Sequence, residues 1–238
     1  RLGIQYDVLP RESEILHLKF WASAFELLKE RKAIYFEEEG KNKGCWVMPA
    51  SAFRGADEAN EDSKVIVRSN GTVTYVGKDI AYQLWKFGLL GKDFFYRLWS
   101  TYPDGHKVWA STTEPQDGAP KFGGGVRVYN VIDSRQSYLQ DVVVAGLRAL
   151  DYQTQADASI HFSYEMVTLS HATARELGYT VPGETDEARK PFVEVSGRKG
   201  LGVKADDLLD MLVAAAGREV RARNAELADA EALRIAEA

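Results

Sequence analysis

The sequence predicts an α/β fold with three parts: a portion of a doubly wound parallel sheet, a small antiparallel β insertion and a C-terminal helical segment. A continuous apolar run from Val126 to Asp133 is typical of a strand buried in a parallel sheet, and apolar residues at helical spacing follow it. Short strand-like runs on both sides of Asn70 and Gly71 predict an antiparallel hairpin. The end of the chain is alanine-rich and helical in pattern.

The composition is that of a globular protein. Of 238 residues, 45% are hydrophobic and 11% aromatic, enough for a core in one large domain or two small ones. The net charge of −5 argues against non-specific coating of nucleic acid, because that affinity comes from excess lysine and arginine. Cys45 is the only cysteine, so we expect a reducing compartment, the cytoplasm. The four histidines lack metal-ligand spacing and no apolar run could span a bilayer, so we expect no metal site and no membrane partner.

The first seventy residues are expected to form a helix and a small sheet. Apolar residues recur at intervals of three and four from Glu12 to Lys32, which predicts one amphipathic helix within a leading segment at 1–33. Strands are predicted at 33–36, 45–48 and 64–68 within a β insertion at 34–70. A type I′ turn at Asn70 and Gly71 should then lead into a strand at 72–76.

The next stretch predicts a strand ending near Tyr75 and a helix opening at Asp79. Asp79 has two interpretations that the sequence leaves open. It could be the N-cap of the helix, or a carboxylate that grips a guanidinium while a nearby aromatic ring stacks on the cation. The segment from Leu89 to Gly125 is expected to be a helix-containing insertion.

The strand at Val126 to Asp133, the helix after it and the strand that follows predict a crossover unit. Gln136 comes just after the C-terminal end of the first strand, where open α/β sheets bind ligands. It is either a ligand contact or a solvated helix start. His161, among apolar residues, is either a packed core residue or a ligand contact.

A glycine-rich basic loop from Ser196 to Gly202 lies between a predicted strand and a helix that opens near Asp206. Glycines let backbone N–H groups approach a polyphosphate, and Arg198 and Lys199 add positive charge. By itself, the loop is either a solvated basic turn or a nucleotide-binding loop.

Four motifs in order resemble the catalytic domain of arginyl-tRNA synthetases, which are class I aminoacyl-tRNA synthetases. They are Arg11-Glu12-Ser13, Tyr75 with Asp79, Asp133 and Gln136 with His161, and the loop from Ser196 to Gly202. Glu194 and Gly197 stand where the class pattern has lysines. The resemblance implies the second half of that domain, a Rossmann-like sheet at 71–200 with an insertion at 89–125, and the start of a helical stem or anticodon-side domain at 201–238.

The resemblance also implies a reaction and a set of site residues. The family activates L-arginine with ATP and Mg²⁺ and transfers it to tRNA(Arg), so the full-length protein would be an arginine–tRNA ligase. Arginine would be held by Tyr75, Asp79 and Gln136. Catalysis would fall to Ser196, Arg198 and Lys199. The ATP-binding residues implied are His161, Ser196, Gly197, Arg198, Lys199 and Gly200.

The family's His-x-Gly-His motif does not occur in these 238 residues. We therefore expect half of the ATP site to belong to another part of a longer protein, and this segment to be inactive alone. A monomer is expected. The alternative is a free-standing, synthetase-derived module that binds arginine or a nucleotide and regulates without aminoacylation.

Overall fold

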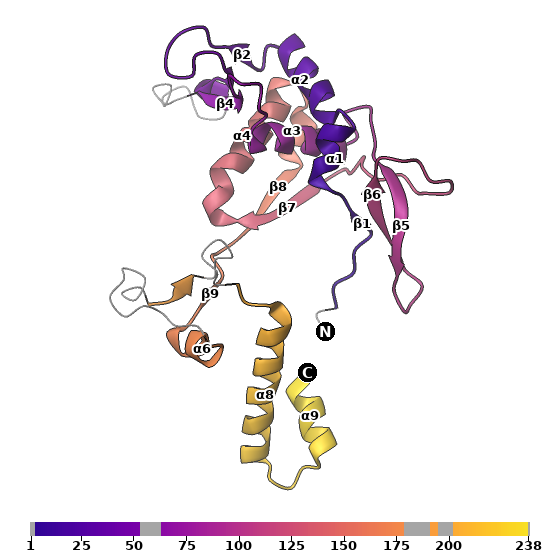
Figure 1. Ribbon diagram of the computed structural model, residues 1–238, viewed down its shortest axis with the longest axis vertical. Coiled ribbons are helices and arrows are strands. Elements are labelled where there is room, and N and C mark those ends of the chain that lie inside the picture. Colours follow the sequence, from indigo (N-terminus) through magenta and orange to yellow (C-terminus); the bar gives the residue numbers. More distant parts are fainter. Residues whose placement is uncertain (1–2, 53–62, 179–190, 195–201, 238) are drawn as a thin grey trace. The chain divides into compact units, whose positions relative to one another are not determined.

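The computed structural model describes residues 3–52, 63–178, 191–194 and 202–237 (Figure 1). It divides the chain into two compact units, Arg1–Glu165 and Met166–Ala238. Helices and both parallel and antiparallel strand pairs are present, so the predicted α/β class is confirmed. Within the described ranges, no helix has the length and apolar character that a bilayer crossing requires.

The first unit begins with two helices where the sequence predicts one. Helix α1 spans Glu12–His17 and helix α2 spans Phe20–Glu30. Between them, Lys19 adopts a left-handed conformation with φ of 57°, which ends one helix and starts the next. The prediction of a continuous helix from Glu12 to Lys32 is therefore wrong, although the buried stripe continues across the break.

The small antiparallel sheet has the order β2-β3-β4. Its strands are β2 (Tyr35–Phe36), β3 (Trp46–Met48) and β4 (Lys64–Val67), and the short 3-10 helix η1 (Ala50–Ala52) follows β3. The turn after β4 is tight: the N–H of Gly71 donates to the carbonyl of Arg68 at 2.8 Å, and Gly71 has a φ of +81°. Because Asn70 is not left-handed, this turn is not the predicted type I′. The predicted strand at 72–76 reduces to one bridge between Val67 and Val73.

Helix α3 spans Tyr75–Lys86 and leads into a β hairpin. The hairpin strands are β5 (Phe95–Thr101) and β6 (Lys107–Thr112), and β6 also pairs in parallel with β1 (Val8–Leu9). The prediction that the insertion contains a helix is wrong. Figure 1 shows the hairpin projecting from the helices of this unit. Asp93 fixes its base, because its Oδ1 accepts from the indole N–H of Trp85 and the backbone N–H of Phe94, both at 2.8 Å.

The crossover unit is present as predicted. Strand β7 (Val128–Asp133) runs through the 3-10 turn η3 (Ser134–Gln136) into helix α4 (Ser137–Ala149), and α5 (Gln153–Asp157) leads to β8 (Ser159–Tyr164). The two strands are parallel, with Asn130 paired with His161. One face of β7 packs under the helices, but Tyr129 and Val131 on the other face are 55% and 63% exposed. The strand is thus buried on one face only in this chain.

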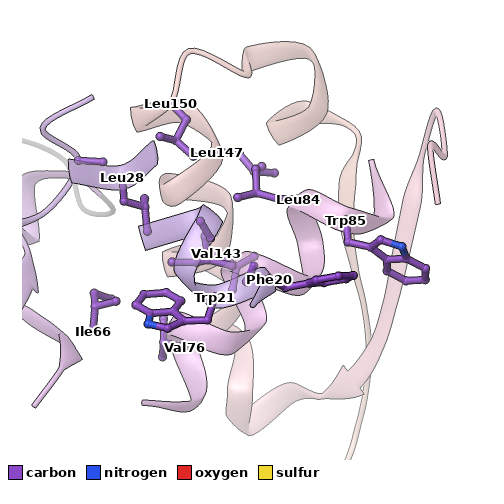
Figure 2. Close-up of a cluster of buried hydrophobic side chains, with 14 of the residues drawn as sticks. Phe20, Trp21, Leu28, Ile66, Val76, Leu84, Trp85, Val143, Leu147 and Leu150 are labelled. Carbon is purple, nitrogen blue, oxygen red and sulfur yellow. The ribbon is translucent and has the colours of Figure 1, made fainter. Parts of the chain in front are cut away.

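The main core lies where α2, α3, α4 and β4 meet (Figure 2). Leu28, Ile66, Leu84 and Leu147 are completely buried there. Helices α3 and α4 approach closely because Gly146 has no side chain: a Cβ at that position would come within 3.2 Å of Ile80 Cδ1. This packing holds α3 and α4 in a fixed relation over β7.

The second unit contains a small sheet and three described helices. Strand β9 (Thr168–Leu169) pairs antiparallel with β10 (Val193–Glu194), and α6 spans His171–Glu176. Helix α8 (Ala205–Arg223) has Asp206 and Asp207 in its first turn, as predicted, and packs against α9 (Asp229–Glu237). A small core of Leu169, Ala174 and Val193 joins the strands to α6.

Candidate functional site

A cavity of about 190 Å³ lies between α3, α4 and β7. Its wall combines two opposite charges with several amide groups and a few apolar side chains. The residues that line it are Asp79, Tyr82, Gln83, Lys86, Asn130, Ile132, Gln140 and Val143. A mixed wall of this kind suits a small polar ligand better than a hydrocarbon.

Helix α3 supplies one side of the cavity because Asp79, Tyr82 and Lys86 recur at intervals of three and four, and so share one helix face. The helix begins at Tyr75, one turn earlier than the sequence predicts. Its N-cap position is Thr74, whose hydroxyl donates to the carbonyls of Val65 and Ile66. Asp79 is therefore not the N-cap, and its carboxylate is not needed to start the helix.

The surroundings of Asp79 disfavour its negative charge. Asp79 is exposed on one side, while the protein that surrounds its other side partly desolvates the carboxylate and raises its pKa above the ordinary value. The charge of Glu12 raises the pKa of Asp79 further, whereas Lys86 and Lys78 lower it. The net shift is upward. A carboxylate in this situation gains free energy from any additional cation that comes within hydrogen-bonding distance.

Glu12 is a site residue to which the sequence assigned no role. It opens helix α1, and its carboxylate forms an ion pair with Lys78 on α3. Its negative charge also raises the pKa of Asp79. The only signal in the sequence was its place in the Arg11-Glu12-Ser13 motif, which marked the segment but gave no reason to place it beside α3.

Lys86 stands at the other end of the cavity and is held by a chain of buried polar groups. Its ammonium donates to Asn130 Oδ1 at 2.8 Å and lies 4.6 Å from the centre of the Tyr82 ring. Asn130 Nδ2 donates to Gln83 Oε1 at 3.4 Å, and Gln83 Nε2 donates to Ser159 Oγ at 2.9 Å. Burial lowers the pKa of Lys86, while Asp79 raises it. Burial also raises the pKa of Tyr82 to about 12.

Tyr75 lies outside this cavity, with 74% of its surface exposed. It borders a larger cavity of about 780 Å³ beside the β2-β3-β4 sheet, which Lys64 and Tyr138 also line. The ammonium of Lys78 lies 4.8 Å from the centre of the Tyr75 ring. Tyr75 and Asp79 thus border different cavities, and Lys78 lies close to both residues.

Gln136 and Gln140 differ in their access to the Asp79 cavity. Gln136 is exposed at the end of η3 and does not line the cavity. Gln140, one helical turn later on α4, is 7% exposed and lines the cavity wall. The structure therefore brings Gln140 to Asp79, whereas the resemblance had pointed to Gln136.

His161 is half-buried on β8, where its Nε2 lies 2.9 Å from the carbonyl oxygen of Ile132. It lines a separate cavity of about 400 Å³ under α4, and that cavity shares Asn130 and Gln140 with the Asp79 cavity. His161 is thus neither a core residue nor part of the Asp79 cavity.

The predicted phosphate-binding residues Ser196, Gly197, Arg198, Lys199 and Gly200 lie outside the described residues. The elements on either side, β10 and α8, are the strand and the helix that the sequence predicts there. In the part of the chain that the structure describes, no three His, Cys, Asp or Glu side chains come together as metal ligands.

Comparison with known proteins adds an independent observation. No family model matches the chain. An arginine–tRNA ligase from Deinococcus radiodurans is 38% identical over 212 residues, covering 88% of this chain and 31% of that protein. One from Thermococcus sibiricus is 33% identical over 239 residues, covering 100% of this chain and 33% of that protein. The arginyl-tRNA synthetase structure from Thermus thermophilus superimposes with a TM-score of 0.72 at 28% identity, over 98% of this chain and 34% of that one.

Fold and relatives together define the class: the chain has the α/β structure of an aminoacyl-tRNA synthetase segment. Within that class, the chain is a fragment of the arginyl-tRNA synthetase family. It spans about a third of the length of the relatives that it matches.

Proposed function

We propose that the chain is the arginine-binding part of an arginine–tRNA ligase, which activates L-arginine with ATP and transfers it to tRNA(Arg). The observation that carries the proposal is Asp79, a carboxylate in the wall of a small polar cavity whose negative charge is disfavoured by desolvation and by the nearby Glu12. An additional cation beside Asp79 would stabilise its negative charge. A guanidinium suits the place best, because it donates hydrogen bonds in parallel pairs to carboxylates.

Each polar group near the two carboxylates then has a proposed role. Asp79 and Glu12 would bind the guanidinium, and the exposed ring of Tyr75 would lie against its flat face. Gln140, which shares a cavity with Asp79, is the stronger candidate for a further polar contact. Gln136 remains a candidate on the resemblance alone.

Activation would depend on positioning and on charge stabilisation. The arginine carboxylate attacks the α-phosphorus of ATP, a carboxylate–phosphorus bond forms, and pyrophosphate leaves with the electrons of the broken P–O bond. This needs no protein nucleophile. Ser196, Arg198 and Lys199 would hold the phosphates, Gly197 and Gly200 would allow close approach, and His161 would lie toward the adenosine. Mg²⁺ would accompany the ATP phosphates.

The relatives favour this proposal over a regulatory module without aminoacylation, because the proteins that align with nearly the whole chain are named as ligases. Binding of tRNA and ATP and a cytoplasmic location are proposed for the whole protein. So is the division into a leading segment at 1–33, a β insertion at 34–70, a catalytic portion at 71–200 and a helical segment at 201–238.

Isothermal titration with arginine and citrulline tests the proposal, because citrulline has nearly the same shape without the positive charge. We expect arginine to bind at least ~10-fold more tightly, since a hydrogen bond to a charged group contributes about 1.5–3 kcal/mol. The exposed Asp117 provides the control variant Asp117→Asn, which should leave both affinities unchanged. Equal affinity for the two ligands would refute a guanidinium site.

A further inference from the structure

Lys78 makes its contacts with the groups to which the proposed function assigns the substrate guanidinium. Its ammonium is paired with the carboxylate of Glu12 and lies 4.8 Å from the centre of the Tyr75 ring. The Lys78 side chain is only 17% exposed, whereas that of Glu12 is 61% exposed. A lysine that lies along the protein in this way has settled into a defined place rather than extending into water.

The third group is Asp79. The positive charge of Lys78 lowers the pKa of Asp79 and opposes the effect of Glu12. The ammonium thus contacts an aromatic ring and one carboxylate, and its charge also acts on a second carboxylate, an environment that favours any cation. Lys29 on α2, which does not line the Asp79 cavity, has similar local chemistry: it pairs with Glu26 at 3.1 Å and lies 5.1 Å from the centre of the Phe25 ring.

We infer that Lys78 is a built-in occupant of the cation site, which pairs with Glu12 and lies over the Tyr75 ring in the ligand-free protein and must leave when a cationic ligand binds. This inference rests on the proposed function. Lys78 is in this sense an affinity-determining residue. An ammonium is a compact charge, whereas a guanidinium offers a rigid fork that bonds a carboxylate twice, so arginine can displace it.

An internal competitor can be recognised because it lowers the binding affinity of every cationic ligand by the same factor. The variant Lys78→Met keeps the length of the side chain and removes the charge. Because a partly exposed ion pair is weak, its loss should lower the dissociation constant for arginine by about 2- to 5-fold. The dissociation constant for agmatine, which has the guanidinium without the carboxylate, should fall by the same factor. The control Lys29→Met should change neither.

Titration of the 238-residue chain with arginine and agmatine separates the outcomes. Weaker arginine binding by Lys78→Met would mean that Lys78 holds Glu12 in place for the ligand, and would overturn the inference. An unchanged dissociation constant would overturn it as well. If only Lys78→Met bound arginine measurably, the inference would be supported.

A second measurement needs no ligand and keeps the inference separate from the proposed function. In a double-mutant cycle of Lys78→Met and Glu12→Gln, the shifts in the thermal unfolding midpoint should be non-additive, because both single changes break the same ion pair. Additive shifts would overturn the inference whatever arginine does. If the shifts were non-additive but no variant bound arginine, Lys78 would be paired with Glu12 in the free protein. The proposed function would then be refuted, and with it the competition between Lys78 and arginine.

Discussion

The substitution Asp79→Asn should separate binding from stability. Burial and the Glu12 carboxylate raise the pKa of Asp79 in the folded protein. For an acid whose folded pKa lies above its unfolded pKa, the folded state is penalised at every pH above both values. That penalty disappears as the pH falls below the unfolded pKa. Asparagine keeps the shape and carries no charge. Because water screens the exposed side of Asp79, Asp79→Asn should raise the unfolding temperature only slightly at pH 7 and have little effect near pH 3.

The same substitution should weaken arginine binding strongly. The lost interaction is a charge-assisted hydrogen bond to the guanidinium, which contributes about 1.5–3 kcal/mol. This corresponds to a ~10- to 100-fold rise in the dissociation constant. Glu12 remains in Asp79→Asn, so some preference for arginine over citrulline should survive.

Titration calorimetry with arginine and thermal unfolding at pH 7 and pH 3 check both halves of the prediction, with Asp117→Asn as the control. A less stable protein that binds arginine with unchanged affinity would refute the reasoning. That result would mean that Asp79 supports the packing of α3 and that no ligand cation approaches it.

Three more outcomes follow from the same contacts. Lys86→Met should raise the pKa of Asp79 further, because the charge of Lys86 lowers that pKa in the wild type. When the dissociation constant for arginine is measured from pH 8 downward, the affinity of the variant should therefore begin to fall at a higher pH than that of the wild type. Gln140→Leu should weaken arginine binding by about 1 kcal/mol, roughly fivefold, while Gln136→Leu should leave it unchanged; the reverse order in titration calorimetry would favour the motif alignment over the cavity. In the longer protein, Arg198→Ala with Lys199→Ala should lower kcat for ATP–pyrophosphate exchange and leave arginine affinity nearly intact, and a change confined to arginine affinity would contradict the phosphate role.

The sequence could predict those parts of the fold where side-chain periodicity is strong. Strand β7 and helix α4 are where the apolar pattern predicts them, and α8 begins at its two aspartates. The break at Lys19 could not be predicted, because lysine, unlike glycine or proline, is not a residue type that indicates a helix break. The insertion from Leu89 to Gly125 forms a β hairpin and not the expected helix, in line with the preference of aromatic residues such as Tyr96 and Trp99 for strands.

The candidate site was only partly predictable, because its members come from distant parts of the chain. Asp79 could be named because its motif is local. Glu12 comes near Asp79 only because α1 packs beside α3. Asn130 lies within a mostly apolar strand, so the sequence does not mark it as a cavity residue. The sequence does not single out Gln140, because the exact start of α4 decides which glutamine faces the cavity, and helix starts are the least certain feature of a sequence-based prediction.

The hydrogen bonds from Lys86 through Asn130 and Gln83 to Ser159 all have the same direction, and this restricts how the protein can evolve. Because Lys86 can only donate, Asn130 must present its oxygen there and its nitrogen to Gln83, which fixes the amide of Gln83 in turn. The hydroxyl of Ser159 completes the series by donating to the carbonyl of Gln155 at 3.1 Å. Gln83 and Asn130 are buried, and Lys86 and Ser159 are half-buried. A substitution at any one of these four positions would leave a neighbouring side chain without its hydrogen-bond partner. We therefore expect the four side chains to be inherited as a set, and diverging lineages to replace them together or not at all.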